Sequence, residues 1–177
     1  MRLVIDANIA QSAGSSDVPI SFYSRECLNE VRECKHVAVF SQQLLDEWGE
    51  HASRISRQWW KSMVARRRVD YTEGDEFAPH LDRACTSLEQ EGWREALRKD
   101  GHLVRSALAT GQLILSNEKD LPQFLALACN RVRELLSLHY GSPAIEGDAC
   151  ISWIRAGAQK DAGRRIDVWV ENHLRGE

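Results

Sequence analysis

The sequence predicts an α/β fold in which helices cover a parallel sheet. Two observations lead to this prediction. Short apolar runs, typical of buried strands, alternate along the chain with longer stretches of helical periodicity. The length of 177 residues also suits one domain with a sizeable hydrophobic core.

In the N-terminal half, the strands are indicated by the apolar, β-prone runs RLVID and HVAVF. Ser41 directly follows the second run and is a typical helix N-cap. Loops are indicated by clusters of Ser, Gly, Pro and acidic residues. In chain order, the expected elements are a strand at 2–6, a loop at 11–19, a helix at about 21–34, a strand at 36–40, one continuous helix at about 41–68 and a loop at 70–80.

In the C-terminal half, a helix whose apolar face includes Leu103 and Ala107 precedes Gly111, which is placed as its C-cap. We expect a domain at 1–140 and a helical C-terminal extension at 141–177 that packs on the same domain. The expected elements are a helix at about 80–97, the helix that ends at Gly111, a strand at 112–116, a helix to about 138, a Gly-Ser-Pro break at 141–143 and helical stretches at about 147–160 and 164–174.

The composition indicates a soluble protein of the cytoplasm. Hydrophobic residues make up 43% of the chain and charged residues 28%. We expect neither a membrane span nor a signal peptide, because no apolar run is long enough and no cleavage pattern follows Met1. The five cysteines are scattered and form no C-x-x-C pair, which argues against a disulfide framework and against zinc. The net charge of −3 argues against a generally basic coat for nucleic acid.

Several carboxylates have positions that bring them to one edge of the expected sheet. Asp6 and Glu118 lie at or just past the carboxyl ends of strands, where ligands collect in parallel sheets. Glu47, in the second turn of a helix, and Asp100, ahead of another helix, can face the same edge. Taken singly, each is more easily explained as a cap, a turn or a solvated residue; their joint placement favours a site. Neighbouring acids are Asp46, Glu50 and Asp120.

Converging carboxylates repel one another by about 4 kcal/mol per pair at about 4 Å and an effective dielectric near 20. A bound cation relieves this repulsion, and oxygen ligands without His or Cys select Mg²⁺ or Mn²⁺. The chemistry expected at such a site is phosphodiester hydrolysis by metal-activated water.

Three segments carry a resemblance to PIN domains, over roughly residues 2–125. LVIDANI at 3–9 resembles the opening strand of the family with its Asp and Asn. SQQLLDEWGEH at 41–51 resembles the helix that carries an acidic residue. DGHLVRSALATGQLILSNEKDL at 100–121 resembles the second half of the domain, in which an Asp, a small-residue helix, a strand, a Ser or Thr and an acid follow in order.

The resemblance implies a three-layer α/β/α sandwich and a nuclease, most often acting on RNA, that depends on Mg²⁺ or Mn²⁺. It also implies an antitoxin protein as a partner, because small members of the family are commonly toxins of toxin–antitoxin pairs; a homodimer is a further candidate assembly. Catalytic and metal-binding roles fall on Asp6, Glu47, Asp100 and Glu118, and orienting roles on Asn8 and Ser116. Glu118 stands where the family usually has Asp, so Asp120 is an alternative fourth ligand.

The expected long helix would place a basic face opposite a tryptophan-containing apolar stripe. On a continuous helix, Glu47 would project close to Arg54, Arg57 and Lys61, which are candidates for binding the nucleic-acid backbone. Two other functions stay open at this point. One is a DNA-directed nuclease that uses the same carboxylates, and the other is a catalytically degenerate PIN fold that serves as a binding or scaffolding module.

Overall fold

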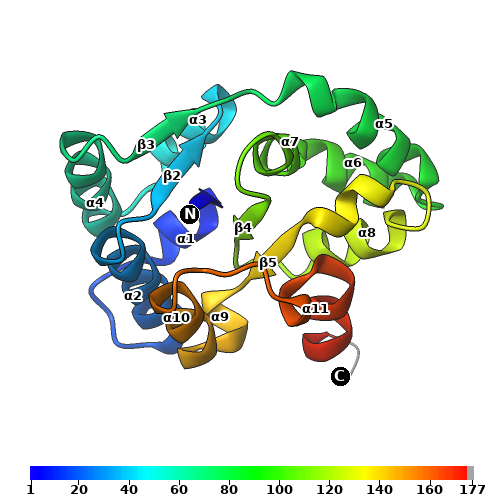
Figure 1. The fold of residues 1–177 in the computed structure, drawn as a ribbon. Helices are drawn as coiled ribbons and strands as arrows, with labels where there is room; N and C mark the ends of the chain where they lie inside the picture. The colour runs from blue at the N-terminus through cyan, green and yellow to red at the C-terminus, as the bar shows by residue number, and fades with distance from the viewer. Residues whose placement is uncertain (175–177) are drawn as a thin grey trace.

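A five-stranded parallel sheet with the strand order β3-β2-β1-β4-β5 forms the centre of the computed structural model (Figure 1). The structure describes residues 1–174. In the middle of the sheet, Val4 is paired with Val39 on one side and with Ile114 on the other. The strands are β1 (Arg2–Ile5), β2 (Val37–Phe40), β3 (Val69–Tyr71), β4 (Leu113–Leu115) and β5 (His139–Gly141).

Helices surround this sheet and make the fold an α/β fold, as predicted. Three short 3-10 helices, η1 (Asp75–Phe77), η2 (Arg133–Ser137) and η3 (Ala162–Arg164), occur in connections within residues 1–174. The α-helices in this part of the chain are α1 (Ala7–Ser12), α2 (Pro19–Glu33), α3 (Gln42–His51), α4 (Arg54–Ala65), α5 (Ala78–Ser87), α6 (Glu91–Lys99), α7 (Gly101–Ala109), α8 (Asp120–Ala128), α9 (Pro143–Glu146), α10 (Asp148–Arg155) and α11 (Ile166–His173).

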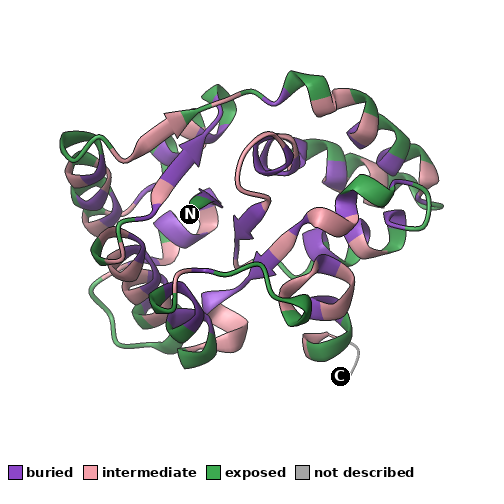
Figure 2. Cartoon of the chain, viewed as in Figure 1, coloured by how far each residue is buried: buried purple, intermediate pink, exposed green. Residues whose placement is uncertain are grey.

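Both faces of the sheet are covered. Leu3, Val4 and Ile5 of β1 are all 0% exposed, although successive side chains of a strand point to opposite faces. Helix α7 packs on one side against β1, β2 and β4, whereas α2 packs against β2 together with α4, α9 and α10 (Figure 1). Figure 2 shows the buried residues concentrated on the strands and on the inward sides of these helices. The carboxyl ends of β1 and β4 therefore open between two helical layers.

The prediction of one continuous helix at 41–68 is wrong, because α3 and α4 are separate helices. Ser41 caps α3 as predicted, its Oγ accepting a hydrogen bond from the backbone N–H of Leu44 at 3.2 Å. The chain then turns at Ala52 and starts again at Ser53, whose Oγ accepts from the N–H of Ser56 at 3.1 Å. A second N-cap serine thus interrupts a pattern whose apolar periodicity continues across the break.

Other local expectations also need correction. Residues 7–12 form α1 rather than leading directly into a loop, and residues 69–71 and 139–141 form the short edge strands β3 and β5. Three-residue strands leave too little alternation to be recognised in a sequence. The helix expected at 80–97 is divided into α5 and α6, and the helix expected to reach 138 ends at residue 128.

Gly111 is not the C-cap of α7, since Thr110 occupies that position. Gly111 is required for another reason. A Cβ atom on this residue would lie 2.0 Å from the backbone oxygen of Arg2, so only glycine lets this turn approach β1.

The C-terminal helices are attached through a buried ion pair. The Glu146 side chain is 2% exposed, and its Oε1 lies 2.8 Å from Nη1 of Arg164. Its Oε2 accepts hydrogen bonds from the backbone N–H of Ser142 at 2.7 Å and from the indole of Trp169 at 3.1 Å. The guanidinium of Arg164 also lies over the ring of Trp153, 4.1 Å from its centre. This carboxylate therefore links α9, η3 and α11 to one another beside β5, the edge strand of the sheet. The boundary expected at residue 140, between the domain and its C-terminal extension, falls within β5.

No helix among residues 1–174 combines the length and the apolar character that crossing a membrane requires. The five cysteines are free.

Candidate functional site

Asp6 lies where β1 ends and α1 begins. Its backbone N–H still donates to the oxygen of Leu115 at 2.9 Å, so the sheet fixes its position. Its Oδ1 accepts a hydrogen bond from the N–H of Asn8 at 3.2 Å, which makes Asp6 the N-cap of α1. The other oxygen, Oδ2, accepts from the Ser116 hydroxyl at 2.6 Å and from the Asn8 amide at 2.8 Å. The Asp6 side chain thus caps α1 and is also hydrogen-bonded to Ser116, which directly follows β4.

A hydrogen-bond network joins the ends of β1 and β4 around this carboxylate. The Asn8 amide nitrogen also donates to Ser116 Oγ at 3.1 Å, while Asn8 Oδ1 accepts from the N–H of Asn117 at 3.1 Å. Ser116 Oγ in turn accepts from the N–H of Glu118 at 3.0 Å. The Tyr140 hydroxyl donates to the backbone oxygen of Glu118 at 2.7 Å. Asn8 and Ser116, the residues expected to orient ligands, therefore both contact Asp6 directly, and the backbone of Glu118 is held beside them.

Asp100 lies at the junction of α6 and α7. It is the N-cap residue of α7, yet its side chain makes no capping hydrogen bond. The carboxylate instead borders the same cleft as Asp6. Burial raises the pKa of Asp100 to about 6, and the negative charges of Asp6 and Glu118 add to this effect while Lys99 opposes it.

Glu47 reaches the cleft from the second turn of α3. Its Oε1 accepts a hydrogen bond from the Gln43 amide at 3.1 Å, and its Oε2 lies 3.3 Å from Nε2 of His102. The His102 side chain is 1% exposed, and its Nδ1 lies 3.2 Å from the backbone oxygen of Lys99. Burial lowers the pKa of His102, an effect that the adjacent Glu47 charge opposes. A buried imidazole on α7 therefore contacts the Glu47 carboxylate of α3.

These four carboxylates line one cleft of about 350 Å³, although they come from four separate segments of the chain. Glu118 is the most exposed of them, and its side chain accepts no hydrogen bond within residues 1–174. The cleft is lined by Asp6, Ala7, Asn8, Gln11, Glu47, His51, Lys99, Asp100 and Glu118.

Burial and neighbouring negative charges together raise the pKa values of two carboxyl groups in the cleft. Burial raises the pKa of Asp6 from 3.8 to about 6, hydrogen bonds from Ser116 and Asn8 lower it, and the charges of Glu118 and Glu47 raise it again. Asp6 also raises the pKa of Asp100. A cation between Asp6 and Asp100 would remove both desolvation and repulsion penalties.

The donor set suits a hard divalent cation. Every carboxylate of the cleft offers oxygen, as Mg²⁺ and Mn²⁺ prefer. Among residues 1–174, no three His, Cys, Asp or Glu side chains are already gathered closely enough to form a metal-binding group. Mg²⁺ commonly uses only one or two protein carboxylates and keeps several waters or phosphate oxygens, so the pair Asp6 and Asp100 fits this mode of binding.

The expected basic residues are not part of the cleft. Arg57 lines a separate pocket between α3 and α4, and Arg54 borders another beside Ser15 and Ser53. The continuous helix that would have placed them beside Glu47 does not exist, because α3 and α4 are separate. Lys61 is exposed on α4. Asp46, Glu50 and Asp120 are likewise not among the residues that line the cleft.

The structure brings residues to the cleft that the sequence analysis missed. Gln11, His51 and Lys99 line it, and His102 contacts Glu47. A signal existed for one of them, because His51 is four residues after Glu47 and so shares its helix face.

We expect the paired acids to make stability depend on pH. Because the folded pKa of Asp6 is about 6 against an ordinary value of 3.8, the folded chain binds this proton more tightly than the unfolded chain. Ionisation of Asp6 therefore destabilises the fold as the pH rises from about 4 to about 6, by about 2–3 kcal/mol in total. The unfolding free energy of Asp6→Asn minus that of the wild type should increase over this range in urea titrations with a chelator. A difference that stays constant between pH 4 and pH 7 would contradict the raised pKa.

A scan of protein-family models, a search of curated proteins and a search of solved structures each gave no match to this chain.

Proposed function

We propose that the chain is a metal-dependent nuclease of the PIN type that hydrolyses RNA phosphodiesters. The observation that carries this proposal is the pair Asp6 and Asp100, which line one cleft and both have a pKa raised to about 6, with Glu47 and Glu118 beside them. Such an arrangement is poorly explained by stability alone, since both acids are less stable ionised in the folded chain than in water. It is well explained by a cation that binds between them.

Asp6 and Asp100 would hold the ion, with Glu47 and Glu118 as further oxygen donors. A divalent cation bound there supplies Lewis acidity toward a phosphate oxygen and lowers the pKa of water. RNA as the substrate, like an antitoxin as a partner, extends the proposal through the resemblance of segments 3–9, 41–51 and 100–121 to PIN domains.

The chain's own residues orient the site. Asn8 and Ser116 fix the Asp6 carboxylate through both of its oxygens, so that it cannot rotate away from the cleft. Gln43 on α3 donates a hydrogen bond to Glu47 Oε1, and His102 on α7 contacts Glu47 Oε2. Glu118, whose carboxylate carries no hydrogen bond from the described residues, is available to position a water or accept its proton.

The direct test is incubation of a mixed single-stranded RNA pool with the protein and Mn²⁺, with EDTA in a parallel sample. Cleavage with Mn²⁺ and none with EDTA is the expected result. A matched DNA pool distinguishes an RNA-directed enzyme from a DNA-directed one. Intact RNA at micromolar protein and millimolar Mn²⁺ would contradict the proposal.

A second candidate is a PIN-like module that binds RNA without cleaving it. It is favoured by the exposed position of Glu118 and by the lack of a gathered three-ligand metal group among residues 1–174. RNA binding without products in the presence of Mn²⁺ would favour this candidate.

Substitutions at positions 118 and 120 test which of these acids supplies the fourth oxygen donor of the cleft. If Glu118 is a working donor, Glu118→Asp should reduce cleavage because the carboxylate retracts by about an ångström, and Glu118→Gln should reduce it further, by about 10–100-fold. Asp120→Asn is the matched control, since Asp120 is exposed and does not line the cleft. Cleavage rates and Mn²⁺ affinities of the three variants separate the roles. A damaging Asp120→Asn with mild Glu118 variants would assign the donor to Asp120.

A further inference from the structure

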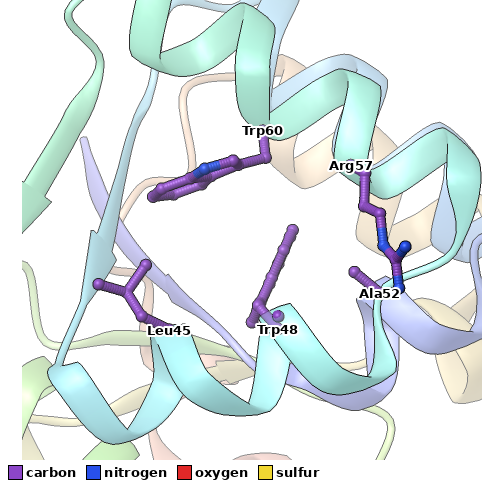
Figure 3. A pocket seen from close by; sticks show the side chains of 6 residues that line it. Leu45, Trp48, Ala52, Arg57 and Trp60 are labelled. Carbon is purple, nitrogen blue, oxygen red and sulfur yellow. The ribbon is translucent and has the colours of Figure 1, made fainter.

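A second cavity lies between α3 and α4, on a different face of α3 from the carboxylate cleft. Its volume is about 330 Å³, which lies within the range of pockets that bind small molecules. Figure 3 shows the rings of Trp48 and Trp60 extending into the space between the two helices, with Leu45 at one end and Arg57 at the other. The residues that line it are Leu45, Trp48, Gly49, Ala52, Arg57 and Trp60.

Trp60 is partly exposed in this pocket. Its ring packs edge-on against Phe40, with 4.5 Å between centres, and lies 6.4 Å from the ring of Trp48. Trp48 and Trp59 are almost fully buried, and their indole N–H groups donate to the backbone oxygens of Ile5 and Leu28. Trp60 has no such partner within residues 1–174, so both an indole N–H and part of an aromatic ring are available to a ligand.

Gly49 keeps the pocket open. It lies in the interior of the ten-residue helix α3, where glycine is less stable than alanine by about 1 kcal/mol. Its φ is not in the positive range within which glycine is needed, and a Cβ atom built on it would meet nothing within 4 Å. Neither backbone conformation nor packing therefore requires glycine here. Its missing side chain leaves open space at the exposed edge of the pocket that it lines.

Arg57 supplies a positive charge at the rim. It is exposed, and its guanidinium forms no ion pair with any acid of residues 1–174. Arg54 and Lys61, one turn away on either side along α4, are exposed as well. An aromatic ring beside an unpaired arginine suits a nucleotide, whose base can stack and whose phosphate can contact the guanidinium.

Helix α3 connects this pocket to the carboxylate cleft. Glu47 and His51 line the cleft, whereas Trp48 and Ala52, the next residue in each case, line the pocket. Because consecutive residues of a helix project about 100° apart, the cleft and the pocket border α3 on neighbouring faces.

We propose that the α3–α4 pocket binds one nucleobase of a single-stranded RNA whose scissile phosphate lies at the carboxylates. The inference rests on the proposed function for the nature of its ligand. Trp60 provides the stacking surface, Arg57 contacts the adjoining phosphate, and Gly49 leaves room for the base.

The test measures binding of a fluorescent single-stranded RNA to the full chain in EDTA, where cleavage is excluded. Gly49→Leu should fill the pocket and weaken binding about 5–100-fold, the range of a lost base–aromatic contact. Gly92→Leu is the matched control, because Gly92 is also an exposed helix glycine without neighbours within 4 Å, on α6. Trp60→Phe should weaken binding less than Trp60→Leu, since it keeps a ring. Oligonucleotides with one abasic nucleotide should lose affinity at a single position.

Unchanged RNA affinity in both Gly49→Leu and Trp60→Leu would overturn the inference. If the same variants instead abolish binding of a protein partner or self-association, the pocket is a protein-docking groove and the inference is also wrong. The two proposals can fail separately. Cleavage by the wild type together with unchanged RNA affinity in Gly49→Leu and Trp60→Leu rejects only the pocket. RNA binding that depends on Gly49 and Trp60 without any cleavage rejects only the nuclease.

Discussion

Asp6→Asn is expected to reduce Mn²⁺-dependent RNA cleavage by at least about 100-fold while the chain stays folded. The substitution removes a charge from the pair Asp6 and Asp100 but keeps the shape of the side chain and an oxygen that can accept from Asn8 and Ser116. Because burial raises the pKa of Asp6 to about 6, the neutral variant should also be more stable than wild type at pH 7 in the absence of metal. Loss of activity together with gain of stability is the signature of a residue retained for function.

Asp100→Asn should behave in the same way, since Asp100 has a similarly raised pKa and makes no capping hydrogen bond that its removal would break. Single-turnover cleavage rates and urea unfolding of each variant provide the two readouts. Asp46→Asn serves as the control, because Asp46 is an exposed acid of α3 outside the cleft. Full activity in either cleft variant would exclude a catalytic role for that carboxylate.

Glu146→Ala should destabilise the fold by about 3–5 kcal/mol, the cost of removing one partner from a buried ion pair. The change leaves the largely buried guanidinium of Arg164 without its carboxylate and removes the acceptor of both the Ser142 N–H and the Trp169 indole. Glu146→Gln keeps an acceptor and should be milder. Urea unfolding at pH 7 measures the effect.

Glu95→Ala is the matched control for that experiment, since Glu95 is an exposed glutamate on α6 whose side chain forms no hydrogen bond or ion pair within residues 1–174. A loss below about 1 kcal/mol in Glu146→Ala would mean that the network contributes little. The C-terminal helices would then be held to the sheet by apolar packing alone.

The central strands and the convergence of the carboxylates could be predicted because both follow from local patterns. An apolar β-prone run is informative by itself, and the carboxyl ends of parallel strands meet at one edge whatever the helices do. The sequence alone therefore predicts that Asp6 and Glu118 lie at one edge of the sheet. The charge coupling between Asp6 and Asp100 could not be predicted from the sequence, since it depends on how α7, which begins after Asp100, packs against β1 and β4.

The break between α3 and α4 could not be predicted from periodicity, and it changes where the basic residues of α4 lie relative to Glu47. The apolar pattern passes through Ala52 and Ser53 without interruption, while the cap at Ser53 depends on a tertiary contact of its N–H with the backbone oxygen of Ala10 at 3.1 Å. Arg57 consequently lies at a pocket between two helices rather than on one face with Glu47. Residues such as Lys99 and His102 were missed because each reaches the site through tertiary packing.

Titration of the metal-free chain with Mn²⁺, with bound ion measured by electron paramagnetic resonance, tests most directly whether Asp6 and Asp100 together hold a cation. We expect the wild type to bind Mn²⁺ and Mg²⁺ to displace the bound Mn²⁺. Asp6→Asn and Asp100→Asn should each weaken Mn²⁺ binding by at least about 10-fold, whereas Asp46→Asn should bind Mn²⁺ as the wild type does. Wild-type chain that binds no Mn²⁺ at millimolar concentration, or that binds it equally well after both substitutions, would contradict the account.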